Sequence, residues 1–97
     1  MPIGLYAENM IHDHTYVEGG FAQAFSRIQR RAREGEMIRY ADPYGDTMFN
    51  RPQLKKLTDE IGAIGERAPE LALDVRTIQD LIVRILRDAG YLWVSGD

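Results

Sequence analysis

The sequence predicts an α+β fold in which a small antiparallel sheet packs against about three helices. Three segments repeat apolar residues at steps of three and four, which is the spacing of one face of a helix. Short segments rich in aromatic and β-branched residues, within 37–49 and at 91–94, have the composition of strands. The alternative is a helical bundle in which 37–49 is only a loop.

Length and composition predict one domain spanning 1–97. A chain of 97 residues is long enough for one packed core and too short for two. The hydrophobic fraction of 44% and the charged fraction of 28% are ordinary for a globular protein. No apolar run approaches the roughly 18 residues that a membrane span needs. The absence of cysteine excludes disulfides, Fe–S clusters and thiol nucleophiles.

The amino-terminal half contains one clear element. Residues 3–7 are short and partly alternating, so a terminal strand is expected there, although Gly4 weakens it. Residues 8–16 have no period and are predicted to form a loop. A helix that Gly35 stops is predicted by the spacing of Phe21, Ala24, Phe25, Ile28 and Ala32.

A β-hairpin is predicted in the middle of the chain. Residues 37–41 are its first strand and residues 46–49 return antiparallel to them. Between the two strands, Asp42 can accept hydrogen bonds from the turn backbone and Pro43 sets φ for the second turn position. Gly45 tolerates positive φ, which completes the turn chemistry.

A helix is expected to begin after the hairpin and to end before Pro69. Asn50 is a preferred N-cap, and Pro52 lies near the first helical positions, where its missing N–H costs nothing. The narrow apolar stripe of this helix consists of Leu54, Leu57, Ile61 and Ile64. Gly62 and Gly65 each cost roughly 0.8 to 1 kcal/mol relative to alanine, so this helix depends on tertiary packing.

A further helix from about Asp74 to Ala89 has a broad apolar face, and Gly90 is its stop. Residues 91–94 are strand-like, and we expect them to pair beside the hairpin. The predicted core consists of Phe25, Ile28, Leu54, Leu57, Ile61, Ile78, Leu81, Ile82 and Ile85.

Metal chemistry has one candidate site, at His12-Asp13-His14. Two imidazoles at i and i+2 can face one ion if the backbone is extended. These are the only two histidines, and the chain has no cysteine, so a closed four-ligand zinc site lacks companions. We therefore expect a polar loop with solvated imidazoles, and no metal or cofactor requirement for folding.

Carboxylates and aromatic rings predict a partner-binding patch. Asp42 and Asp46 flank the predicted turn, and Asp97 joins them if the last strand runs beside the hairpin. Such acids can bind Mg²⁺ or face a basic partner, although turn chemistry alone accounts for Asp42 and Asp46. Tyr44 lies at the turn tip, and Trp93 shares one strand face with Tyr91. The predicted patch consists of Asp42, Tyr44, Asp46, Trp93 and Asp97.

A basic run follows the middle of the first helix. At 100° per residue, Arg27, Arg30 and Arg31 form one polar stripe and Arg33 lies elsewhere. This pattern is typical of the solvated side of an amphipathic helix, and the net charge of −3 argues against general nucleic-acid binding.

Two motifs suggest a family. The run Tyr44-Gly45-Asp46-Thr47-Met48-Phe49-Asn50 and the closing Tyr91-Leu92-Trp93-Val94-Ser95-Gly96-Asp97 resemble a group of small bacterial proteins with a YGDTxFN centre and a YLWxxGD end. The resemblance covers the last half of the chain and implies no catalytic residue. Small bacterial proteins of this type are often partner proteins, including immunity proteins that neutralise a toxin.

These observations favour a non-enzymatic interaction module, immunity-like or regulatory, that binds a basic protein such as a toxin or an enzyme. Without a secretory signal at its start, the chain is expected to be cytoplasmic, and a homo-oligomer is compatible with the pattern. One alternative is a nucleic-acid-associated regulator that uses the helix carrying Arg27 to Arg33. Another is a small metal-dependent hydrolase built from Asp42, Asp46, Asp97 and a histidine.

Overall fold

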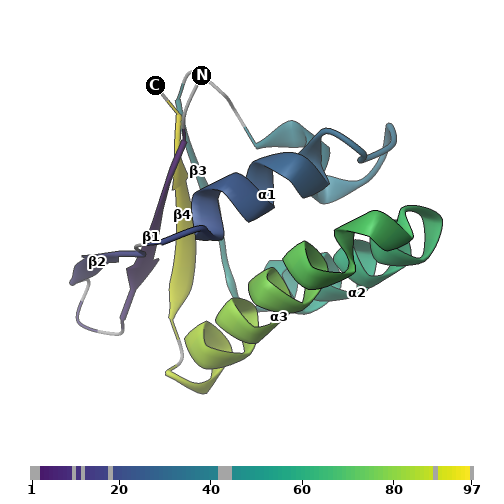
Figure 1. Cartoon of the computed structure of the whole chain (residues 1–97). Helices are drawn as coiled ribbons and strands as arrows, with labels where there is room; N and C mark the ends of the chain where they lie inside the picture. Colours follow the sequence, from purple (N-terminus) through teal and green to yellow (C-terminus); the bar gives the residue numbers. More distant parts are fainter. Residues whose placement is uncertain are drawn as a thin grey trace.

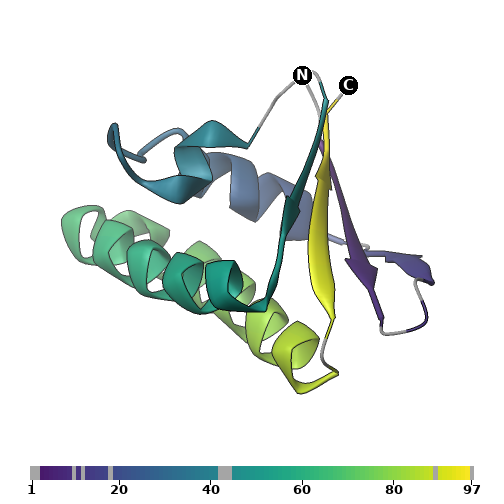
Figure 2. The same cartoon turned by 180° about the vertical axis from the view of Figure 1, so that it is seen from behind.

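The computed structural model describes residues 3–9, 11, 13–17, 19–41, 45–88 and 90–96. Within them, one antiparallel sheet has the order β2-β1-β4-β3 and consists of β1 (Gly4–Glu8), β2 (His14–Tyr16), β3 (Asp46–Phe49) and β4 (Tyr91–Ser95). The α-helices are α1 (Phe21–Gln29), α2 (Arg51–Arg67) and α3 (Ala72–Arg87). These helices all lie on one side of the sheet, as Figure 1 and the reverse view in Figure 2 show. The predicted α+β class is confirmed.

The core lies between the helices and the inner face of the sheet. All nine residues of the predicted core are buried. The sheet adds a layer that the helical patterns did not include, namely Leu5, Phe49, Leu92 and Val94. Among the described residues, no helix is both long enough and apolar enough to cross a lipid bilayer.

The start of α2 confirms the predicted cap and adds a partner to it. The Asn50 side chain accepts from the Gln53 backbone N–H at 3.0 Å, and the Gln53 side chain accepts from the Asn50 N–H at 2.9 Å. This reciprocal pair is a capping box, which satisfies two otherwise free donors. The helix ends at Arg67, before Pro69, as predicted.

The two glycines of α2 allow close packing against α3. A Cβ at Gly65 would lie 3.1 Å from Val75 Cγ2, and one at Gly62 would lie 3.2 Å from Gln79 Nε2. Both distances are shorter than comfortable van der Waals contact. The two glycines lower the intrinsic helix stability of α2, but their lack of a side chain allows α2 and α3 to approach closely.

The predicted loop at residues 8–16 is wrong at both of its ends. The expected strand at 3–7 is present as β1 and extends to Glu8, and His14–Tyr16 form β2. The β1–β2 ladder continues through Val17 N–H to Leu5 O at 2.8 Å and Asn9 N–H to Asp13 O at 3.1 Å. Because all three residues of β2 are exposed, the strand leaves no burial pattern in the sequence.

The predicted strand at 37–41 is also wrong, because Met37–Tyr40 form the 3₁₀ helix η1. Side chains form hydrogen bonds with the backbone groups that would have paired in a strand ladder. The Gln29 amide donates to Ile38 O and to Ala41 O, both at 3.0 Å, and the Met37 N–H donates to Glu60 Oε1 at 2.8 Å. The predicted hairpin therefore does not form.

Strand β4 takes the place of the missing hairpin partner. It pairs with β3 on one side and with β1 on the other, so the closing segment lies in the middle of the sheet. The strand character of 46–49 and 91–94 is confirmed. The predicted stop of the first helix at Gly35 is wrong, because α1 ends at Gln29, before Ala32. Helix α3 begins at Ala72, two residues earlier than predicted, after the short 3₁₀ helix η2 (Pro69–Leu71).

Candidate functional site

The sheet has a second face that none of the described helices covers (Figures 1 and 2). Successive strand residues point to opposite faces, so the neighbours of the buried Leu5, Leu92 and Val94 point away from the helices. Directly paired residues share a face, which extends this assignment across all four strands. We call this surface the outer face, and it carries Tyr6, Glu8, His14, Tyr16, Asp46, Met48, Tyr91 and Trp93.

Glu8 organises the outer face. Its side chain is the buried charged group among the described residues, with a relative exposure of 6%. One carboxylate oxygen lies 2.9 Å from His14 Nε2 and also accepts a hydrogen bond from the Trp93 indole N–H. Burial of a carboxylate is tolerated only with such partners. Glu8 therefore fixes two rings that come from different strands.

Aromatic rings surround this carboxylate. The rings of His14 and Trp93 have centroids 5.4 Å apart at an interplanar angle of 39°. Those of Tyr6 and Tyr16 lie 5.3 Å apart at 60°. Tyr16 is 53% exposed and Met48, opposite Trp93, is 39% exposed. The outer face thus leaves ring and thioether surface in contact with solvent.

A hollow of about 250 Å³ lies within the outer face. Its lining consists of Tyr6, His14, Asp46, Trp93 and Ser95. Asp46 pairs directly with Ser95, and Tyr6 pairs directly with Trp93, so the register places a carboxylate next to two aromatic rings. We call this site the ring hollow.

Part of the predicted patch comes together here. Asp46 and Trp93 lie on the same face and both line the ring hollow. Trp93 is half-buried and held by Glu8, so it is less exposed than the prediction assumed. Asp42, Tyr44 and Asp97 lie outside the described residues.

Sequence reasoning did not include Tyr6 and Glu8 among the candidate residues, and it considered His14 only as a metal ligand. The predicted strand at 3–7 stopped one residue short of Glu8. Continued to Glu8, it would have placed Tyr6 and Glu8 on one face, because they are two residues apart. Nothing in the sequence near His14 indicated its strand. The approach of Glu8 to Trp93 joins positions 85 apart in the chain and follows only from strand pairing.

Charge separates the two sides of the molecule. The four strands contain Glu8 and Asp46 but no lysine or arginine. The predicted arginine stripe lies at the end of α1 and just beyond it, and Arg27 and Arg31 face acids of the neighbouring elements. Arg27 donates to both carboxylate oxygens of Asp74 at 2.7 and 2.8 Å, and this pairing lowers the pKa of Asp74.

The rest of the stripe is similarly engaged. Arg31 donates to Glu70 at 2.8 Å. The pKa of the Glu70 carboxyl is lowered mainly by a hydrogen bond from its own backbone N–H and further by Arg31. The Arg30 guanidinium contacts its own helix at Ser26 O, at 3.4 Å. The stripe is half exposed, as predicted for a solvated face, but ion pairs with η2 and α3 offset two of its charges.

The structure describes only part of the candidate metal site at His12-Asp13-His14. His14 lies in β2 and not in the expected loop, and its ring is hydrogen-bonded to Glu8 while its side chain remains 48% exposed. His12 lies outside the described residues. Within the described ranges, no group of three or more histidine, aspartate or glutamate side chains is placed to hold an ion.

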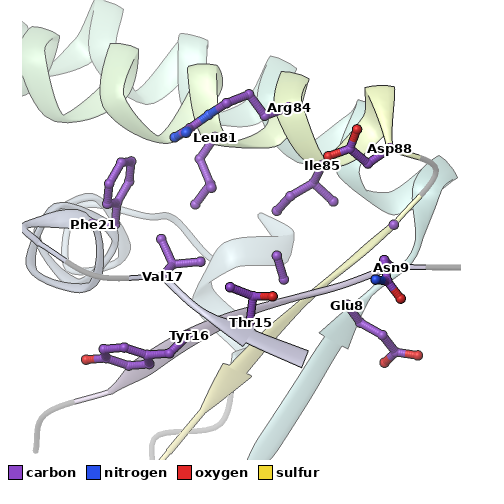
Figure 3. Close-up of a pocket in the computed structure, with 12 residues that line it drawn as sticks. Glu8, Asn9, Thr15, Tyr16, Val17, Phe21, Leu81, Arg84, Ile85 and Asp88 are labelled. Atoms are coloured by element: carbon purple, nitrogen blue, oxygen red, sulfur yellow. The ribbon is translucent and has the colours of Figure 1, made fainter. Parts of the chain in front are cut away.

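A separate cleft of about 460 Å³ opens on the helical side of the sheet (Figure 3). Val17, Leu81 and Ile85 point into it, whereas the Glu8 side chain points away toward the outer face. The Arg84 guanidinium lies 5.6 Å from the Phe21 ring centroid at one end. Asp46 and Trp93, the two patch residues that the structure describes, do not line this cleft.

Fold and outer face together define the class of this protein: a small α+β domain whose sheet is covered by helices on one side only. Comparison with protein-family models, curated proteins and solved structures finds no match to the chain. The functional proposal therefore depends on the chemistry of the outer face.

Proposed function

We propose that this protein is a non-enzymatic interaction module, immunity-like or regulatory, that binds a basic protein partner in the cytoplasm through the outer face. One observation supports this most strongly: aromatic rings and carboxylates share an uncovered sheet face whose strands have no lysine or arginine. Aromatic anchors supply binding energy at protein interfaces, and carboxylates select a basic partner.

The exposed side chains differ from those of an ordinary solvated sheet face. The water side of an antiparallel sheet usually carries polar residues alternating with the core. Here the corresponding positions hold tyrosines, a tryptophan and a methionine. Burial of this surface by a partner would contribute a favourable free energy of roughly 25 cal/mol per Å² of apolar area removed from water.

A single nucleic-acid strand is less well supported as the occupant. Such strands do stack bases on aromatic side chains, but the binding groove must also carry cations that track the phosphates. The four β-strands carry no lysine or arginine, and Arg27 and Arg31 are paired with acids on the helical side. A protein with exposed lysine or arginine complements the outer face better.

The test compares matched variants in binding to a partner captured from the native host and then purified. Asp46→Lys reverses a charge on the outer face, and Asp59→Lys does so at an exposed position of α2. We expect Asp46→Lys to weaken binding at least about tenfold, because like charges oppose across an interface. Asp59→Lys should bind as the parent does.

A second pair controls for aromatic surface. Tyr16 on the outer face and Tyr40 on η1 are exposed to similar extents, 53% and 60%. Tyr16→Ala should weaken binding, whereas Tyr40→Ala should not. The proposal would be overturned if both variants lost partner binding equally. It would also be overturned if the chain bound only itself, or if nuclease treatment abolished capture of the partner.

A further inference from the structure

We infer that the ring hollow is a binding pocket for a single guanidinium group, supplied by an arginine side chain of the partner. This inference rests on the proposed function and specifies its central contact. The supporting observations are the hollow's ring walls, its carboxylate, the rigidity that Glu8 gives it, and the lack of a competing cation on the strands.

The walls have the chemistry that attracts a flat cation. Tyr6 and Trp93 are directly opposite each other in the β1–β4 ladder, so two aromatic side chains border the same space. The face of an aromatic ring is negative, and tryptophan is the strongest partner for cations. A guanidinium can stack on such a ring while its N–H groups remain available in the plane.

Asp46 supplies the in-plane partner. Its carboxylate lies at the β3 side of the hollow, opposite Ser95. The planar fork of a guanidinium matches a carboxylate with two parallel hydrogen bonds, a geometry that an ammonium lacks. Stacking and pairing together favour arginine over lysine.

Glu8 makes the pocket rigid before any ligand arrives. Rotation of the Trp93 ring would break its hydrogen bond to a carboxylate that is 6% exposed. The same carboxylate contacts His14 Nε2 at 2.9 Å, so a second wall is also held. Walls that are already ordered reduce the entropy lost on binding.

The charge around the pocket is unbalanced in favour of a cation. Glu8 and Asp46 are acidic, and His14 is the basic side chain in the lining. A guanidinium in the hollow would therefore meet the carboxylate of Asp46 in the lining and lie near that of Glu8 behind it.

The chain provides its own reporter, because Trp93 is its single tryptophan. We expect N-acetyl-arginine amide to change the Trp93 fluorescence of the full chain in a saturable manner, with a millimolar dissociation constant. N-acetyl-citrulline amide has the same shape without the charge and should produce no saturable change. N-acetyl-lysine amide should bind several times more weakly.

Variants assign the signal to the pocket. Asp46→Asn should weaken binding of the arginine probe about fivefold or more, since it removes the paired charge. Asp59→Asn on α2 should leave it unchanged. No saturation, equal binding of the citrulline probe, or equal effects of the two variants would overturn the inference, and lysine binding as tightly as arginine would overturn the planar pairing.

The outcomes separate this inference from the proposed function. If the arginine probe saturates but the partner binds Asp46→Lys normally, the pocket exists and the interface lies elsewhere. If Asp46→Lys and Tyr16→Ala weaken partner binding but the probe neither binds nor competes, the interface is right and the guanidinium pocket is wrong.

Discussion

Glu8 holds an unusual position, because it is a carboxylate buried on a sheet face that no described helix covers. Its stability there depends on the indole N–H of Trp93 and on His14 Nε2. A buried donor that loses its acceptor costs its full desolvation free energy, whereas replacing donor and acceptor together by apolar groups is nearly neutral. The aromatic surface of the outer face is thus organised by one side chain.

Glu8→Ala should destabilise the protein by roughly 1–3 kcal/mol, because it leaves the Trp93 N–H and the His14 ring without their acceptor. Glu8→Gln keeps an acceptor oxygen and should cost less. Denaturant unfolding measures both variants, and the Trp93 emission spectrum reports whether the ring has moved. An Ala variant with parental stability and spectrum would show that Glu8 does not hold the indole.

Gly90 has no space for a side chain, because the Glu8 backbone of β1 and the Ile85 side chain of α3 lie next to it. A Cβ at this position would lie 2.3 Å from the backbone carbonyl oxygen of Glu8, which a flexible side chain cannot relieve. Gly90→Ala should therefore destabilise the fold by about 1–3 kcal/mol, the usual cost of overpacking. Gly20→Ala is the control, because nothing lies within 4 Å of its Cβ position. Equal melting temperatures for the two variants would contradict this.

At the scale of elements, the sequence predicted what has a period and missed what depends on distant partners. Both long helices and the cap at Asn50 are visible in local spacing. The 3₁₀ helix η1 is not visible, because Gln29 and Glu60 on other elements take its backbone groups. Likewise, the sequence indicated Asp46 and Trp93 as candidates, whereas their neighbours across the sheet required the strand order.

An ion pair fastens the segment after α1 to the end of α2. Arg67 donates to the two carboxylate oxygens of Glu36 at 3.0 and 2.9 Å, and the Arg33 backbone N–H donates to the same carboxylate at 2.6 Å. The Arg67 guanidinium is the main cause that lowers the pKa of Glu36 below its usual 4.5.

A carboxyl whose pKa is lowered by folding contributes stability above its ordinary pKa and loses it as pH falls. Glu36→Gln should therefore be less stable than the parent at pH 7, and the difference should shrink as the pH falls below about 4.5. Unfolding free energies measured between pH 7 and pH 3 test this. A constant difference across that range would mean that the ion pair contributes nothing to stability.

At the scale of the whole molecule, two faces of one sheet carry different chemistry. The inner face and its helices bury the apolar core, and Arg27 and Arg31 are paired with acids beside them. The outer face keeps rings and carboxylates without lysine or arginine. This asymmetry is the basis for our proposal that a partner binds the sheet and not the helices.

The central claim is that the partner binds the outer face, and backbone amide chemical-shift mapping of the isotope-labelled chain with its purified partner tests it most directly. The account predicts that the largest shifts and line broadening fall on Tyr6, His14, Asp46 and Trp93 and on their strand neighbours. Amides of α1 near Arg27 and Arg31 should be little affected. Perturbations centred on that helix, with the strands unchanged, would contradict the account.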